Sequence, residues 1–192
     1  MSIELKRLLE LKPFFSDEIC IVGNASSLLS KQTGQQIDSY QTVIRLNIGF
    51  PKHKSSQGSK TDIVGLSCPI SYWKYRWYFR RTPIIWMTER RDIIPVWMKH
   101  SKEFNLYPLE YWQNLSERLD GKRPSTGVMM VDLICNYIQP RSLAIIGFDF
   151  KKSRTLFASK EKLGPHDWEA EEAFVLATVQ QGQKDGRRWE II

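Results

Sequence analysis

Residues 18–27 read Glu-Ile-Cys-Ile-Val-Gly-Asn-Ala-Ser-Ser. The apolar run Ile19-Cys20-Ile21-Val22, three of whose residues are β-branched, predicts a buried strand over residues 18–22, because such side chains fit a pleated surface that is covered on both faces. The small polar residues from Asn24 to Ser30 predict a turn that leads into a short helix. Free backbone N–H groups and the helix dipole converge at such a junction, so we expect it to bind an anion.

A second junction of the same kind lies about a hundred residues later. Arg123-Pro124-Ser125-Thr126-Gly127 directly precedes an apolar run, and residues 126–138 are expected to form a helix with Ser125 or Thr126 as its N-cap. Pro140 should end that helix. Two anion-binding turns in one small chain indicate a ligand with separated polar groups, such as a nucleotide sugar.

Strands and helices are expected to alternate along the chain. Besides residues 18–22, strands are predicted at 42–46, 63–66, 83–87, 142–147 and 188–192. Helices are predicted at 3–11, within 91–102 after a turn at Pro95, and at 168–180, and a loop at 52–60. This pattern indicates a single α/β domain over residues 1–192, Rossmann-like, with a mainly parallel sheet flanked by helices. Ligands of such sheets bind beyond the C-terminal strand ends, where Asn24, Asn47 and Asp149 should lie.

Composition narrows the class of protein. The chain has 192 residues, 42% of them hydrophobic and 12% aromatic, which excludes a disordered chain. No apolar run approaches the roughly 20 residues that span a bilayer. A signal peptide has an uninterrupted apolar centre, whereas charged residues interrupt the N-terminal segment of this chain. A cytoplasmic location is therefore expected. Cys20, Cys68 and Cys135 are widely spaced, which indicates no metal site, and Cys20 and Cys135 are expected to be reduced core residues because they sit in apolar runs.

The net charge of +7 favours an anionic partner. Residues 73–81, Trp-Lys-Tyr-Arg-Trp-Tyr-Phe-Arg-Arg, concentrate aromatic and cationic side chains. Such a segment suits a lipid headgroup boundary, a wall on which a sugar stacks, or a nucleic-acid platform. It equally fits a half-buried helix with a basic outer face, and composition does not choose among these.

His166 is the best candidate for a general base. It follows Gly164-Pro165 and precedes a helix that contains Glu171, and a histidine in such a place can titrate near neutral pH. It could instead be an N-cap or a surface histidine. The sequence lacks G-x-G-x-x-G, Walker A, G-x-S-x-G and D-x-D motifs. The absence of D-x-D favours a nucleoside monophosphate donor that leaves without a metal, so no cofactor is expected.

Four segments, in order, resemble the motifs of the sialyltransferases, glycosyltransferase family 29. Residues 20–47 with 58–61 resemble the large sialyl motif, and residues 124–127 with 145–148 resemble the small one. His166 and Glu171 have the H-x-x-x-x-E spacing of the very small motif. The resemblance runs from about residue 19 to 171. Residues 146–150 are also similar to bacterial sialyltransferases of the smaller family and to transferases of the related sugar Kdo.

The resemblance implies a sialyltransferase-like variant of the GT-A fold and a CMP-activated 2-keto sugar acid as donor. It implies that His166 deprotonates an acceptor hydroxyl, with inversion at the anomeric carbon. Lys152 or Arg154 could supply charge to the phosphate. The remaining residues expected to bind the donor are Gly23, Asn24, Ala25, Ser26, Asn47, Ser125, Thr126, Gly127, Gly147, Asp149 and Glu171.

The chain departs from the family pattern in three ways. The third motif, with a His near Tyr and Trp, has no match between residues 151 and 165. The family's disulfide lacks its second cysteine at Pro140, which a reducing cytoplasm explains. The chain is also short, so elements that bind the acceptor are expected to be reduced.

The expected partners are the CMP-sugar donor, a glycan or lipid-linked acceptor of lipopolysaccharide or capsule synthesis, and peripherally the inner membrane surface. Nucleic acid is not an expected partner. Two other functions stay open at this point: a basic nucleic-acid-binding module, and a degenerate relative that binds CMP without transfer.

Overall fold

The structure is a computed structural model and describes residues 13, 15–80, 82–154, 156 and 165–192. The helix expected at residues 3–11 lies outside the described residues. One sheet of seven strands has the order β5-β4-β3-β2-β1-β6-β7, and each pair of neighbours is parallel. The strands are β1 (Glu18–Val22), β2 (Thr42–Leu46), β3 (Ile63–Leu66), β4 (Ile84–Trp86), β5 (Phe104–Leu106), β6 (Ser142–Ile146) and β7 (Arg188–Ile191).

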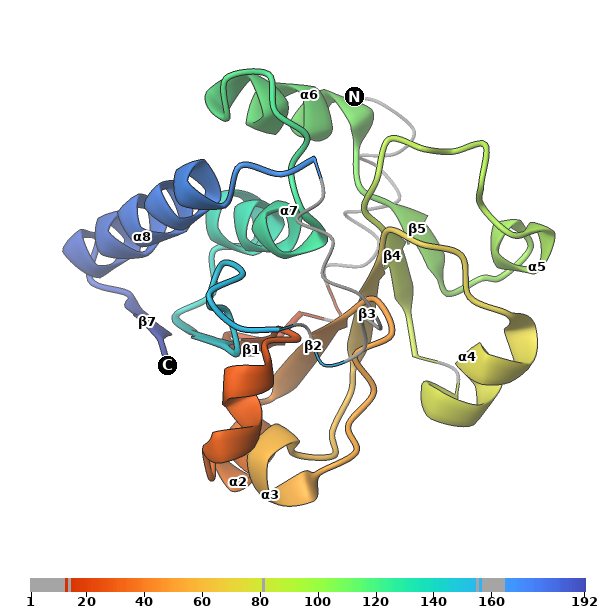
Figure 1. Cartoon of the computed structure of the whole chain (residues 1–192), viewed down its shortest axis with the longest axis horizontal. Helices are drawn as coiled ribbons and strands as arrows, with labels where there is room; N and C mark the ends of the chain where they lie inside the picture. The colour runs from red at the N-terminus through yellow and green to blue at the C-terminus, as the bar shows by residue number, and fades with distance from the viewer. Residues whose placement is uncertain (1–12, 14, 81, 155, 157–164) are drawn as a thin grey trace.

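Helices cover both faces of the sheet (Figure 1). They are the 3-10 helix η2 (Ser26–Ser30), α2 (Gly34–Ser39), α3 (Lys54–Gln57), α4 (Tyr72–Tyr78), α5 (Val96–Lys99), α6 (Leu109–Arg118), α7 (Thr126–Asp132), the π-helix η3 (Leu133–Ile138) and α8 (Trp168–Lys184). The main core joins one sheet face to α6, α7, η3 and α8. On the other face η2 and α2 cover β1, β2 and β6, while α4 and α5 pack on β3 and β4.

Alternation along β1 divides its side chains between these two layers, as expected for a doubly covered strand. Ile19 and Ile21 belong to the main core, whereas Cys20 belongs to the cluster on the opposite face. Cys135 lies in the main core, so the sheet separates the two thiols. Both thiols are free and buried, which confirms the expectation of reduced core cysteines.

The predicted strands are confirmed, three of them with the expected bounds and three shortened by one or two residues. The helix predicted at 91–102 is wrong beyond the four residues of α5, and the loop predicted at 52–60 contains α3. The predicted helix 126–138 is regular only to Asp132, continues as a π-helix, and stops at Gln139 (φ 55°) before Pro140. β5 and α6 were not predicted. No helix within the described ranges has both the length and the apolar character to cross a membrane.

Candidate functional site

A cavity of about 230 Å³ lies at the C-terminal edge of the sheet. Its walls come from segments far apart in the sequence: the turn after β1, the end of β2, the start of α7, the segment after β6, and the beginning of α8. His166 and each residue predicted to bind the donor, except Ser26, border it. Asn24, Asn47 and Asp149 therefore meet at one edge, as the parallel sheet predicts.

The two asparagines tie the strand ends together. Asn24 Nδ2 donates to the carbonyl of Leu46 at 2.9 Å. Asn47, in the left-handed region at φ 51°, donates from Nδ2 to Thr126 Oγ1 at 3.1 Å and accepts from the backbone N–H of Ser67 at 2.8 Å. An amide NH₂ carries two hydrogens, so each asparagine can present a second donor to a ligand.

The start of α7 is built by a cap and by a distant carboxylate. Ser125 is the N-cap of α7, and its hydroxyl accepts from the N–H of Val128 at 3.3 Å. Glu171 on α8, 2% exposed, accepts from the Ser125 N–H at 2.7 Å and from the Ser125 hydroxyl at 2.5 Å. Burial raises the pKa of Glu171 to about 7, although the two Ser125 bonds oppose the shift. Glu171 thus braces the turn that precedes α7.

His166 is held in one tautomer by a backbone carbonyl. Its Nδ1 lies 2.7 Å from the carbonyl oxygen of Arg123 and 3.9 Å from Glu171 Oε1. A carbonyl can only accept, so Nδ1 carries the hydrogen and Nε2 of the neutral ring keeps its lone pair. Burial lowers the pKa of His166, and the bond to Arg123 partly opposes this. The ring is therefore neutral near pH 7 and able to accept a proton at Nε2.

The alternative of His166 as an N-cap is wrong. Asp167 is the N-cap of α8, and its side chain accepts from the N–H of Ala170 at 3.1 Å. The histidine ring instead packs edge-on against Trp168, with the ring centroids 5.0 Å apart. Its side chain is 21% exposed, so it is a half-buried group at a cavity wall rather than a surface histidine.

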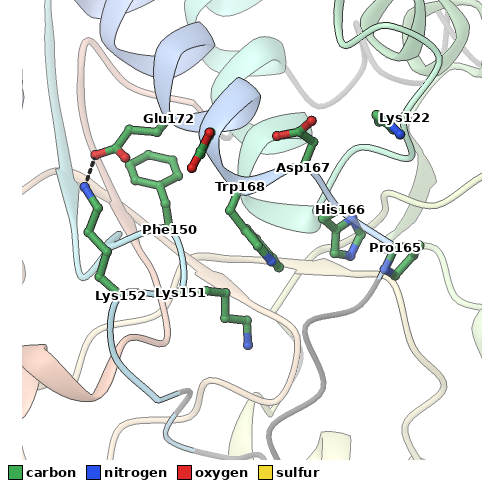
Figure 2. A pocket seen from close by; sticks show the side chains of 10 residues that line it. Lys122, Phe150, Lys151, Lys152, Pro165, His166, Asp167, Trp168 and Glu172 are labelled. Carbon is green, nitrogen blue, oxygen red and sulfur yellow. Dashed lines mark hydrogen bonds and ion pairs between the residues drawn. The ribbon is translucent and has the colours of Figure 1, made fainter.

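Two further cavities meet at His166. One, of about 620 Å³, is drawn in Figure 2, where His166 and Trp168 lie opposite Phe150 and Lys151. The other, of about 220 Å³, is bordered by Ser67, Cys68, Thr88 and Arg123. His166 and Trp168 also border the 230 Å³ cavity, so the two rings lie where the 230 Å³ and 620 Å³ cavities adjoin.

Neither of the predicted phosphate-binding cations borders the 230 Å³ cavity, although Lys152 borders the 620 Å³ cavity. Lys152 forms an ion pair with Glu172 at 2.5 Å (Figure 2). Arg154 borders none of the three cavities, and its carbonyl accepts from the N–H of Ser26 at 2.7 Å. Ser26 in turn donates its hydroxyl to Ser153 at 3.1 Å, away from the cavity.

The cation that the sequence analysis missed is Lys151. It borders both the 230 Å³ and the 620 Å³ cavities, and its Nζ lies 5.6 Å from the centroid of the Trp168 ring. Phe148, Phe150 and Trp168 were also missed as lining residues. Their closeness in sequence to Asp149 and His166 was the one available signal. No group of three His, Cys, Asp or Glu side chains in the described part of the chain could hold a metal ion.

Comparison with known proteins agrees with this geometry. Residues 16–99 match the model of glycosyltransferase family 29 (sialyltransferase). No curated protein sequence matches the chain significantly. A mammalian sialyltransferase solved with Gal-beta-1-3GalNAc-ortho-nitrophenol has a TM-score of 0.61 and 20% identity, over 94% of this chain and 71% of that one.

A bacterial structure is similar to the same extent. The sialyltransferase CstII from Campylobacter jejuni, solved with cytidine-5'-monophosphate, has a TM-score of 0.63 and 15% identity, over 92% of this chain and 80% of that one. These likenesses show a shared fold. The family match covers β1, its turn and Asn47, the segment in which the large sialyl motif was recognised. The chain therefore carries a segment similar to the sialyltransferase family of glycosyltransferases, on a fold that it shares with solved sialyltransferases.

Proposed function

We propose that this glycosyltransferase moves sialic acid from CMP-sialic acid to a hydroxyl group of a glycan or lipid-linked saccharide, with His166 as general base. The observation that carries the proposal is the position of His166 between three cavities, with Nδ1 bound to the Arg123 carbonyl. The solved relatives add support, since CstII was crystallised with CMP and a trisaccharide acceptor.

The donor is assigned to the 230 Å³ cavity. The second amide hydrogens of Asn24 and Asn47 would bind oxygen atoms of the nucleotide, and the first N–H groups of α7 would hold the donor carboxylate or phosphate. Lys151 at the rim would add positive charge. Donors fixed by the fold stabilise charge on the departing phosphate without having to reorganise.

In the transfer step the acceptor O–H gives its proton to Nε2 of His166 while the oxygen attacks the anomeric carbon. The bond from that carbon to the phosphate oxygen breaks, and CMP leaves with the electron pair. Attack from the face opposite CMP inverts the configuration. The transition state resembles an oxocarbenium ion. The absence of a D-x-D motif supports a reaction that needs no metal, so turnover should persist in EDTA.

Calorimetry with CMP, CDP and UDP tests the donor assignment, and we expect a clear preference for CMP. Replacing His166 by Ala should abolish transfer while CMP binding stays nearly unchanged. Mass spectrometry of products made from CMP-sialic acid and from CMP-Kdo identifies the sugar. Equal binding of the three nucleotides would refute the assignment, and CMP binding without transfer by the wild-type protein would identify a degenerate relative.

A further inference from the structure

The aromatic and basic segment singled out in the sequence forms an exposed ridge on α4. Trp73 and Trp77 are 79% and 81% exposed and, four residues apart, lie on one face of the helix. The opposite face, with Tyr75 and Phe79, is buried at 4% and 2% exposure. A large apolar ring left almost wholly in water is rare on a soluble protein, and two adjacent ones indicate an interaction surface.

The ridge is firmly attached to the fold. The hydroxyl of Tyr75 donates to the carbonyl of Thr82 at 2.7 Å, and its ring stacks on Trp97 of α5 with centroids 4.9 Å apart. Trp97 Nε1 also donates to the carbonyl of Ile70 at 3.2 Å. α4 and α5 lie together at the margin of the molecule away from α8 (Figure 1). Trp73 and Trp77 are thus presented by a fixed support.

The segment that forms the ridge carries charges of one sign, although Glu103 lies near Tyr75 on its buried face. Residues 67–88 contain Lys74, Arg76, Arg80 and Arg81 and no acidic residue. Val96, at the start of α5, adds an apolar side chain that is 71% exposed. Indole rings favour the boundary between headgroups and acyl chains, and neighbouring cations favour anionic headgroups.

We propose that this ridge, defined by Trp73, Lys74, Trp77, Arg80 and Val96, docks the enzyme on the surface of a bilayer that contains anionic lipid. Nucleic acid fits this ridge less well than a bilayer does. Single strands bind along grooves, and no residue of α4 borders any of the three cavities described above. The inference concerns this surface and does not depend on the identity of the donor.

Docking there would bring the catalytic edge close to the lipid. Ser67 and Cys68 border the 220 Å³ cavity beside His166, and α4 begins four residues later, at Tyr72. Four residues span at most about 14 Å. The mouth of this cavity therefore stays near the membrane plane, where a lipid-linked saccharide would be within reach.

Flotation with vesicles tests the proposal. One set is phosphatidylcholine alone, and the other adds phosphatidylglycerol at roughly one part in three, which supplies the negative surface that basic residues recognise. We expect binding to the anionic vesicles that weakens with salt. Trp73→Ala/Trp77→Ala should reduce binding at least tenfold, and Lys74→Gln/Arg80→Gln by about fivefold for each lost charge.

Matched controls come from exposed residues elsewhere. Leu29→Ala/Leu176→Ala removes side chains that are 40% and 44% exposed, and Lys31→Gln/Lys184→Gln removes two distant charges. Neither control should change vesicle binding. All four variants should bind CMP as the wild type does, so a loss of vesicle binding can be told apart from a failure of the proposed donor site. The proposal fails if the wild type does not float, if the tryptophan variant floats equally well, or if single-stranded RNA displaces the vesicles by binding the ridge.

Discussion

The backbone of Gly23 lies directly against the carbonyl of Gly147, so closely that a β-carbon at position 23 would stand 2.3 Å from that oxygen. Gly147 itself has φ +74°, a conformation that suits glycine. The turns after β1 and β6 cross at this point, and the N–H of Ala25 donates to the same Gly147 carbonyl at 3.2 Å. The 230 Å³ cavity, which both glycines border, depends on this close approach of two backbones.

Replacing Gly23 by Ala should therefore destabilise the protein by roughly 1–3 kcal/mol, as overpacking against an unyielding backbone does. CMP binding should weaken as well, because the turn must shift. Chemical denaturation and calorimetry measure the two effects. Ser30→Ala, at an exposed position of η2, serves as the control and should stay within about 0.5 kcal/mol of the wild type. Wild-type stability in Gly23→Ala would contradict the packing described here.

The buried carboxyl of Glu171 predicts a pH-dependent stability. Its pKa is raised in the folded state to about 7, so between its ordinary value of 4.5 and 7 the folded chain holds a proton that the unfolded chain has lost. The contribution of this group is complete below pH 4.5 and is lost as the pH rises through 7. It amounts to about 3 kcal/mol at most.

The free energy of unfolding, measured by chemical denaturation across this pH range for the wild type and for Glu171→Gln, isolates the contribution of this carboxyl group. The stability of the wild type relative to the variant should decline as the pH rises. Glu169→Gln, at an exposed position two residues away, should leave the pH dependence of the wild type intact. A flat difference for Glu171→Gln would show that its carboxyl is not a buried acid.

The lowered pKa of His166 predicts where the rate of transfer falls on the acidic side of the pH–rate profile. Burial lowers the pKa of the imidazole below its usual 6.5, so the ring stays neutral through neutral pH and loses its basic form only in more acidic solution. The kcat/KM of transfer should remain level down to pH 6.5 and then fall. A limb that begins above pH 7 would mean that another group is titrating.

Lys151 and Lys152 form a matched pair for the phosphate site. Lys151 borders both the 230 Å³ and the 620 Å³ cavities, whereas Lys152 borders only the 620 Å³ cavity, where it pairs with Glu172. Lys151→Ala should weaken CMP binding by about tenfold, the effect of losing one charge-assisted contact. Lys152→Ala should have little effect on CMP affinity by calorimetry. The reverse order would return the role to the lysine expected from sequence.

The sequence predicted the sheet well because buried parallel strands are continuous apolar runs, which need no knowledge of their neighbours. β5 and α6 escaped prediction for physical reasons. Phe104–Leu106 is too short to show a period, and Leu109–Arg118 carries aromatic residues of modest helix propensity whose burial depends on the main core.

The sequence by itself determined the parallel α/β fold, the two small-residue turns and the order of the segments that resemble the large, small and very small sialyl motifs. These follow from local hydrophobicity and backbone preference. Only the tertiary structure decided which atoms do what. It set the tautomer of His166 through a carbonyl 43 residues away, joined Glu171 to Ser125 across 46 residues, and placed Lys151 rather than Lys152 at the donor cavity. Such pairings depend on how distant elements pack, because a side chain takes its direction and its partners from the surface it lies against.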